Sequence, residues 1–162
     1  GFEALVDHLG DDYELGARAA QQGYQVELVD VVVETALPDY GWKAFWSHQL
    51  RWARNVKDRR TAQYFGLVVT FGLAWALLAV LWAPRAWWTW MILALMAFVR
   101  LRAAVLCGKR LLGDRRIPCD IWLVPLRDLV ALAIWTASFF GNEIEWRGEH
   151  FRLRSGKLQP LS

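Results

Sequence analysis

The chain has 162 residues, of which 56% are hydrophobic and 22% are charged, and its formal net charge is only +3. Charge lies mainly in residues 1–60 and 141–162 and apolar residues lie between 64 and 140, a division typical of water-exposed segments flanking a membrane block. The cysteines and histidines have no metal-ligand spacing, so they predict no metal site. The basic residues adjoin an apolar run, so we expect no nucleic-acid partner.

The first forty residues are predicted to be mixed helix and strand. A short helix is expected over 2–9, ending at Gly10, and a second helix from Asp11 to about residue 22. Asp11 and Asp12 suit a helix start because carboxylates accept its free N–H groups and offset its dipole. The β-branched, partly alternating run over 24–34 predicts a strand.

Residues 42–57 show a helical period, with aromatic residues gathered on one face and Arg51 pointing away from it. Such a tryptophan-rich stripe with a cationic back predicts a helix lying in the membrane interface. Basic residues just before the first long apolar run indicate the cytoplasmic side, facing anionic lipid headgroups. They are Arg51, Arg54, Lys57, Arg59 and Arg60.

Two apolar runs, 64–82 and 87–106, are each long enough to cross about 30 Å of hydrocarbon as a helix, and together they predict a transmembrane hairpin. Tryptophans around Pro84 and Arg85 match an aromatic belt on the far side of the bilayer. A third apolar helix is expected over 121–140. It either spans the membrane or forms a re-entrant or interfacial helix, and both alternatives stay open. Residues 143–153 alternate apolar and polar side chains and predict a β-hairpin.

Asp12 is the first candidate for chemistry. An enzyme that inverts an anomeric centre needs a carboxylate to take the proton of the attacking hydroxyl, and a helix start gives that carboxylate a fixed direction. The alternative is that Asp11 and Asp12 only cap the helix.

His48, Arg51 and Trp52 are the second candidate, because spacings of three and four residues place them in one patch on a helix. The guanidinium can bind a diphosphate through paired hydrogen bonds, and the indole can form a wall beside it. The alternative is an interfacial helix with ordinary arginine snorkelling and tryptophan anchoring.

The order of acidic pair, helix, strand, Arg-Trp motif and membrane helices resembles the membrane-integrated GT-A glycosyltransferases. In that superfamily a carboxylate of an acidic pair is the base, and a Q-x-x-R-W motif lies at the membrane surface. Asp12 matches the base, with Asp11 in place of the common Glu. His48 stands where processive synthases have Gln, which favours the ceramide glucosyltransferase-like branch and, within it, bacterial hopanoid-biosynthesis glycosyltransferases. Residues 10–16, 125–129 and 146–148 are similar to that branch as well.

The resemblance implies an α+β fragment. Residues 1–40 would be the C-terminal part of a GT-A catalytic domain, 41–62 an amphipathic interface helix with the HxxRW motif, 63–140 two to three membrane helices, and 141–162 a β-hairpin tail. The chain opens at Gly1 and has no D-x-D in the relevant place. We therefore expect a fragment that is inactive alone, in which the ligands of a divalent metal (Mg or Mn) expected in the intact enzyme are missing.

The resemblance also implies a function, the transfer of a sugar from a UDP-linked nucleotide-sugar to the hydroxyl of a ceramide-like or hopanoid-like membrane lipid. Asp12 would be the base, and Asp11 would contact the substrate beside it. Arg51 would clamp the diphosphate. Trp52 would form a wall of the site, and His48 would make a supporting polar contact. The expected partners are donor, lipid acceptor and bilayer, and the expected location is the bacterial inner membrane with the catalytic face cytoplasmic. A processive polysaccharide synthase of the cellulose or hyaluronan type and a non-catalytic membrane adaptor are the alternatives.

Overall fold

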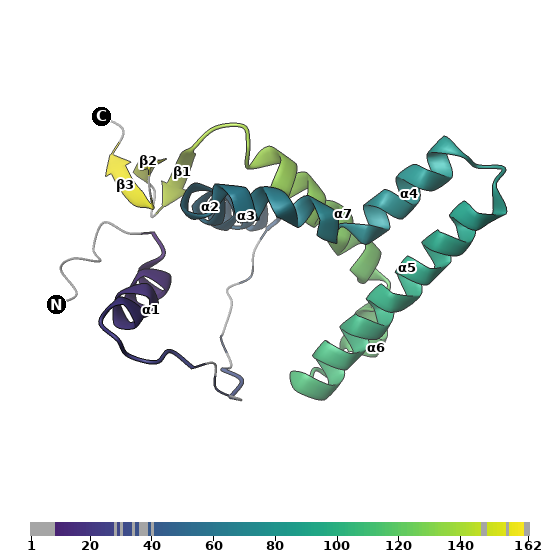
Figure 1. Ribbon diagram of the computed structural model, residues 1–162, viewed down its shortest axis with the longest axis horizontal. Coiled ribbons are helices and arrows are strands. Elements are labelled where there is room, and N and C mark those ends of the chain that lie inside the picture. The colour runs from purple at the N-terminus through teal and green to yellow at the C-terminus, as the bar shows by residue number, and fades with distance from the viewer. Residues whose placement is uncertain are drawn as a thin grey trace. The chain divides into compact units, whose positions relative to one another are not determined.

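The computed structural model describes residues 9–27, 29, 31–33, 35, 39, 41–146, 149–154 and 156–160. The chain divides into two compact units. Unit 1 comprises Gly1–Tyr64 and Ile134–Ser162, and unit 2 comprises Phe65–Ala133. Figure 1 shows both units and labels the α-helices and the strands.

The first helix of unit 1, α1, runs from Asp11 to Gln21 and confirms the second predicted helix. Gly23 follows it with a φ of +87°, a conformation that favours glycine after a helix end. The strand predicted over 24–34 is wrong for the residues described there, which form neither helix nor strand. The predicted helix over 2–9 lies outside the described residues, apart from Leu9, which is in a turn.

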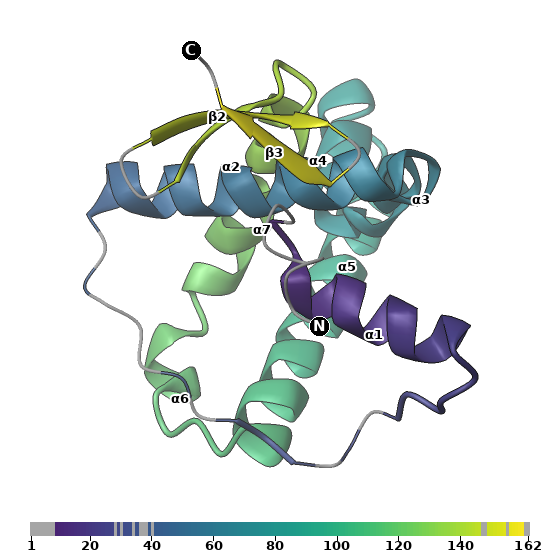
Figure 2. The same cartoon turned by 90° about the vertical axis from the view of Figure 1, so that its left-hand side faces the viewer.

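The long helix of unit 1, α2 (Trp42–Arg59), confirms the predicted helix and is followed by the short α3 (Thr61–Gly66). Three strands, β1 (Glu143–Trp146), β2 (Glu149–Arg154) and β3 (Lys157–Pro160), form an antiparallel sheet in that order. The predicted hairpin is thus confirmed and gains a third strand. Figure 2 shows the sheet lying along α2.

Alternation along the strands gives the sheet an inner face. Ile144 is opposite Phe151, and Leu153 is opposite Leu158. Ile144 is 4% exposed and Leu153 is 2% exposed, so this face is the buried one. Because side chains two residues apart share a face, Trp146 lies on the same side of β1 as Ile144.

The last turn of α7 (Leu123–Ala137) and the residues after it belong to unit 1 and are joined to α3 by buried polar groups. The Tyr64 hydroxyl donates to Ser138 Oγ at 3.0 Å, and Trp135 Nε1 donates to the Tyr64 carbonyl oxygen at 3.0 Å. Ser138 is fully buried, so these bonds satisfy groups that would otherwise be costly to remove from water.

Unit 2 is almost entirely helical. It contains η2 (Leu67–Thr70), α4 (Gly72–Trp82), α5 (Trp87–Val105), the π-helical segment η3 (Leu106–Leu111), α6 (Ile117–Asp120) and most of α7. By length and composition, Trp87–Leu111 is a helix that could cross a membrane. Thr61–Thr70 and Gly72–Trp82 pass the same test as a pair bent by 55°. The predicted helix over 87–106 is present, whereas the one predicted over 64–82 is broken into α3, η2 and α4.

The turn between α4 and α5 is closed by two side chains. Thr89 Oγ1 donates to the carbonyl oxygens of Ala86 at 2.7 Å and Ala83 at 3.1 Å. Trp90 Nε1 donates to the Pro84 carbonyl oxygen at 2.9 Å. These bonds satisfy carbonyl groups that a helix end and a tight turn leave without partners.

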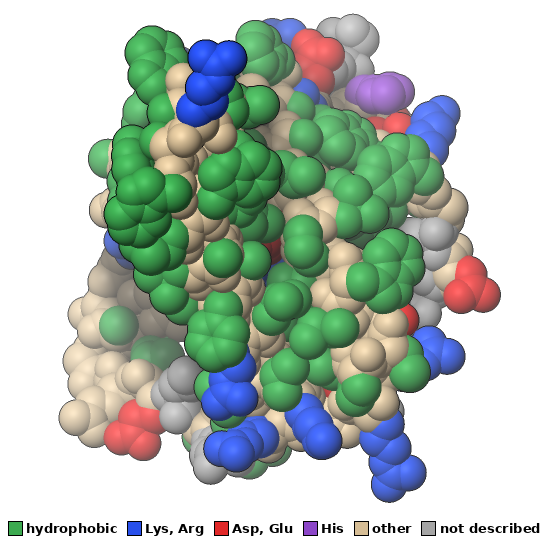
Figure 3. All heavy atoms as spheres, turned by 90° about the vertical axis from the view of Figure 1, so that its right-hand side faces the viewer, with side chains coloured by type: hydrophobic (Ala, Val, Ile, Leu, Met, Phe, Trp, Pro, Cys, Tyr) green, Lys and Arg blue, Asp and Glu red, His purple; other side chains and the backbone are tan. Residues whose placement is uncertain are grey.

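Many apolar side chains of unit 2 face outward. Figure 3 shows hydrophobic side chains covering the face over α4 and α5, with Lys and Arg at its borders. Trp82, beside the turn, is 91% exposed and Trp87 is 73% exposed. An apolar surface of this extent, bordered by cations and tryptophans, is typical of a membrane-facing surface.

The third apolar segment forms a shorter helix than predicted. At 15 residues and about 1.5 Å per residue, α7 is about 22 Å long, less than the roughly 30 Å of hydrocarbon. Pro125 lies in its first turn, where proline is tolerated. Near this end Asp128 accepts a hydrogen bond from Arg100 Nη2 at 2.7 Å, an ion pair within unit 2.

Candidate functional site

A pocket in unit 1 gathers residues from three parts of the chain. It has a volume of about 140 Å³ and is lined by Leu9, Arg51, Trp52, Asn55 and Trp146. Three of these residues come from α2, whereas Leu9 precedes α1 and Trp146 ends β1. Whole small-molecule sites occupy about 300–1,000 Å³, so this pocket would hold only part of a substrate.

Arg51 is the charged residue of this pocket. It is half-buried, and its guanidinium forms no hydrogen bond or ion pair with any residue that the structure describes. A guanidinium offers several N–H donors in a plane, which match the oxygens of a phosphate. The pocket is therefore suited to an anionic group.

Trp52 and His48 are joined one turn apart on α2, as their spacing predicts. Trp52 Nε1 donates to His48 Nε2 at 3.3 Å. Burial, and then the positive charge of Arg51, lower the pKa of His48. A neutral imidazole has one nitrogen free to accept a hydrogen bond, so the lowered pKa fits the acceptor role of Nε2.

The neighbouring cations Arg54 and Lys57 are used inside the protein rather than on lipid headgroups. The Arg54 guanidinium donates to the carbonyl oxygens of Glu143 and, at 2.7 Å, of Phe140. Lys57 Nζ donates to the Ser138 carbonyl oxygen. Burial lowers the pKa of both side chains, and the charge of Arg54 lowers that of Lys57 further. Both cations join α2 to the segment that links α7 and β1.

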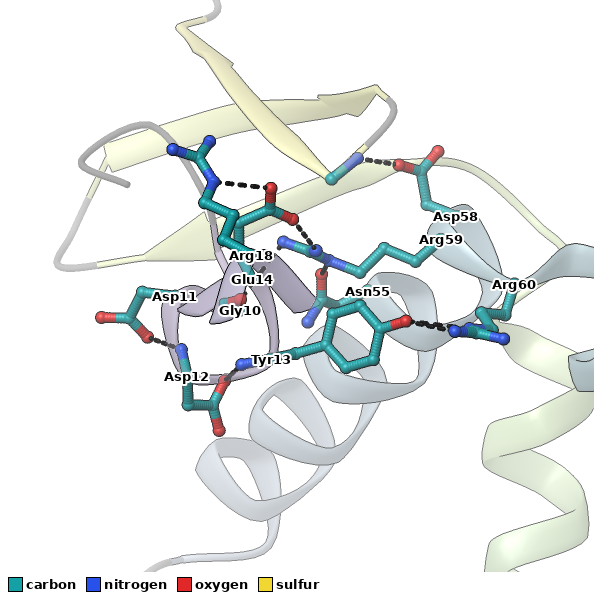
Figure 4. A network of polar contacts seen from close by, with 11 residues as sticks. Gly10, Asp11, Asp12, Tyr13, Glu14, Arg18, Asn55, Asp58, Arg59 and Arg60 are labelled. Carbon is teal, nitrogen blue, oxygen red and sulfur yellow. Dashed lines mark hydrogen bonds and ion pairs between the residues drawn. The ribbon is translucent and has the colours of Figure 1, made fainter. Parts of the chain in front are cut away.

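Arg59 joins the start of α1 to α2, as Figure 4 shows. Its guanidinium pairs with Glu14 at 3.2 Å and donates to Asn55 Oδ1 at 3.2 Å and to the Gly10 carbonyl oxygen at 3.3 Å. A Cβ on Gly10 would lie 3.0 Å from Asn55 Nδ2, so the two segments approach closely here. The interpretation of the basic cluster as lipid-facing is therefore wrong for Arg54, Lys57 and Arg59.

Asp11 and Asp12 lie at the first turn of α1, and both are exposed. The backbone N–H of Asp12 donates to Asp11 Oδ1 at 3.0 Å, and that of Tyr13 donates to Asp12 Oδ1 at 2.7 Å. In Figure 4 both carboxylates point away from Arg59. Neither residue is among those that line the pocket. The structure thus brings together His48, Arg51 and Trp52 and leaves the acidic pair outside, so the role of Asp12 as a base stays a prediction.

The described residues offer no site for a divalent metal. Among them, His, Cys, Asp and Glu form no group of three or more that could hold an ion.

Three lining residues, Leu9, Asn55 and Trp146, were not among the predicted site residues. Asn55 lies four residues after Arg51, the helical spacing that also relates Trp52 to His48, so its place in the patch was predictable. The alternation around Ile144 predicted the face on which Trp146 lies. No local signal indicated that this face would contact α2.

Comparison with known protein families identifies the family of this chain. A family model described as glycosyl transferase family 21 matches residues 1–159, and the chain therefore belongs to this family. The resemblance to ceramide glucosyltransferases is confirmed at the family level. No curated protein and no solved structure matches the chain.

Proposed function

We propose that this member of glycosyl transferase family 21 moves a sugar from a UDP-linked donor to the hydroxyl of a membrane lipid. The observation that carries the proposal is Arg51, a half-buried cation without an ionic partner among the described residues, in a pocket beside Trp52. In a glycosyltransferase the group that departs from the sugar is a phosphate, and a guanidinium stabilises the negative charge that it gains.

The proposed reaction is a single displacement. The acceptor oxygen attacks the anomeric carbon, the bond from that carbon to the phosphate oxygen breaks, and the acceptor proton goes to the Asp12 carboxylate. Arg51 binds the departing diphosphate. Trp52 forms a wall of the pocket, and His48 holds its indole through the hydrogen bond to Nε1. Asp11, next to the base, would contact the acceptor.

The proposed acceptor is a lipid, ceramide-like or hopanoid-like, because the chain carries a large outward-facing apolar surface on α4 and α5. We infer an integral protein of the bacterial inner membrane with the pocket on the cytoplasmic side. The resemblance also implies a divalent metal, Mg or Mn, which would help to bind the diphosphate.

The test is turnover by the full-length enzyme in lipid nanodiscs with UDP-glucose and either ceramide or a hopanoid. Mass spectrometry of the lipid extract should show a product heavier by one hexose, with UDP released in equal amount. A polymer in the aqueous phase would support the processive synthase instead. If the enzyme consumes no UDP-sugar, the proposed function is refuted, and the non-catalytic membrane adaptor remains as the alternative.

A further inference from the structure

We propose that Trp146, at the end of β1, binds the sugar of the donor and forms a second aromatic wall of the Arg51 pocket. This inference rests on the proposed function and assigns the C-terminal sheet to the substrate site. Trp146 lies outside the acidic pair and outside the His48–Trp52 segment.

The position of Trp146 follows from how the sheet is attached to α2. Ile144 and Trp146 share the inner face of β1, and Ile144 is buried. One end of β1 is fixed by Arg54, which donates to the Glu143 carbonyl oxygen. The turn between β2 and β3 is fixed as well, because the N–H of Gly156 donates to the Asp58 carboxylate. With the sheet fixed at two points, the indole is placed beside α2.

Within the sheet the indole is held by a further contact. The rings of Trp146 and Phe151 meet edge to face, with centroids 6.3 Å apart. Aromatic pairs of this geometry add stability beyond the area that they bury. Trp146 is half-buried and lines the pocket, so part of its surface remains available to a ligand.

The chemistry of the pocket fits the junction of sugar and phosphate. Arg51 supplies the cation for a phosphate, while Trp52 and Trp146 supply flat apolar surfaces. A pyranose ring presents C–H groups on its faces and can pack against an indole. Because about 140 Å³ is well below the range for a whole ligand, the sugar and the adjoining phosphate would occupy the pocket, and the nucleoside would lie outside it.

A lipid acceptor fits the same pocket less well. Its chain would suit Leu9 and the two indoles, but an uncharged headgroup would cover Arg51 without neutralising it. Enclosing a cation without a partner is costly. The donor, which carries the phosphate, is therefore the better occupant.

The experiment measures binding of UDP and of UDP-glucose to the full-length enzyme by calorimetry. Trp146→Leu should weaken UDP-glucose binding about tenfold, about 1.4 kcal/mol, and leave UDP binding within about twofold. Trp146→Phe, which keeps a flat ring, should lose less. Trp42→Leu is the matched control, since Trp42 is an exposed tryptophan of α2 outside the pocket, and it should bind both ligands as the wild type does.

The two proposals fail in different ways. If Trp146→Leu binds UDP-glucose as tightly as the wild type, or instead raises only the KM of the lipid, Trp146 does not bind the donor sugar, while sugar transfer by the wild type would still stand. If the wild type binds UDP-glucose but transfers no sugar, the proposed function fails and the binding comparison still decides the role of Trp146. If the wild type binds neither ligand, both proposals are overturned.

Discussion

At the scale of single residues, the basic side chains of α2 separate into two groups. Arg54, Lys57 and Arg59 donate to carbonyl and carboxylate oxygens of unit 1, whereas Arg51 has no such partner among the described residues. The sequence places all of them in one cationic cluster. It could not separate them, because most of the acceptors are backbone carbonyls that reach α2 only through the fold.

His48 gives a test at this scale. Its pKa is lowered from the ordinary value of 6.5 in the folded protein, so the unfolded chain takes up the proton first as the pH falls. The contribution of neutral His48 to the stability of the folded protein is therefore complete above about pH 6.5, and it is lost as the pH falls below that value. His48→Gln keeps an acceptor for Trp52 Nε1 and does not titrate. We expect melting temperatures between pH 7.5 and 5.5 to fall less for His48→Gln than for the wild type.

The comparison with the wild type removes the contributions of the other titrating groups, since these are the same in both proteins. An equal fall in melting temperature for both proteins would contradict the lowered pKa of His48.

At the scale of elements, the sequence predicted the helix α2 and the hairpin, whose patterns are local, and was wrong for the strand over 24–34, which needs a distant partner. The alternation over 143–153 succeeded because a hairpin pairs with itself. The run over 24–34 is β-branched and also alternates in part, but a strand needs a neighbour for its N–H and C=O groups, and the described residues provide none there. The third strand was missed because Lys157–Pro160 is short and ends in proline.

The attachment of the sheet to α2 can be tested at Gly156. This glycine has a φ of +76°, and a Cβ there would lie 2.9 Å from Arg59 Cζ. Gly156→Ala should therefore lower the free energy of unfolding by the backbone strain, about 1–2 kcal/mol. It should lower it further because the new methyl group displaces Arg59. Chemical unfolding of the purified enzyme measures the loss.

Gly23→Ala is the matched control. Gly23 has a similar φ of +87°, and a Cβ there would meet no atom within 4 Å. The Gly23→Ala variant should lose only the strain energy from its free energy of unfolding. Equal losses of unfolding free energy in the two variants would show that Arg59 does not restrict the turn at Gly156.

At the scale of the whole molecule, the chain combines a unit that carries the pocket with a unit whose surface is largely apolar. Composition predicted this division, and it also predicted α5. It did not predict the break near Phe71 that leaves α4 as only the second part of the run over 64–82. The boundary within α7 was not predictable, because the apolar run continues across it and only the contacts of Ile134 and later residues assign them to unit 1.

The proposed orientation in the membrane can be tested by labelling. Cys107 and Cys119 are free and exposed, beyond the end of α5, and Arg85 lies in the turn between α4 and α5. A membrane-impermeant maleimide should label the wild type only after cells are permeabilised. Arg85→Cys, with both native cysteines changed to Ser, should be labelled in intact cells. Labelling of both proteins from the same side would contradict the hairpin.

The most direct test of the central claim compares Asp12→Asn and Arg51→Gln in the full-length enzyme. Asp12→Asn should lower kcat about 100-fold or more while UDP binding is unchanged, because it removes the base alone. Arg51→Gln should weaken UDP binding, and Asp11→Asn is the control for the acidic pair. Undiminished turnover by Asp12→Asn, or undiminished UDP binding by Arg51→Gln, would contradict an enzyme in which the carboxylate and the guanidinium serve one reaction.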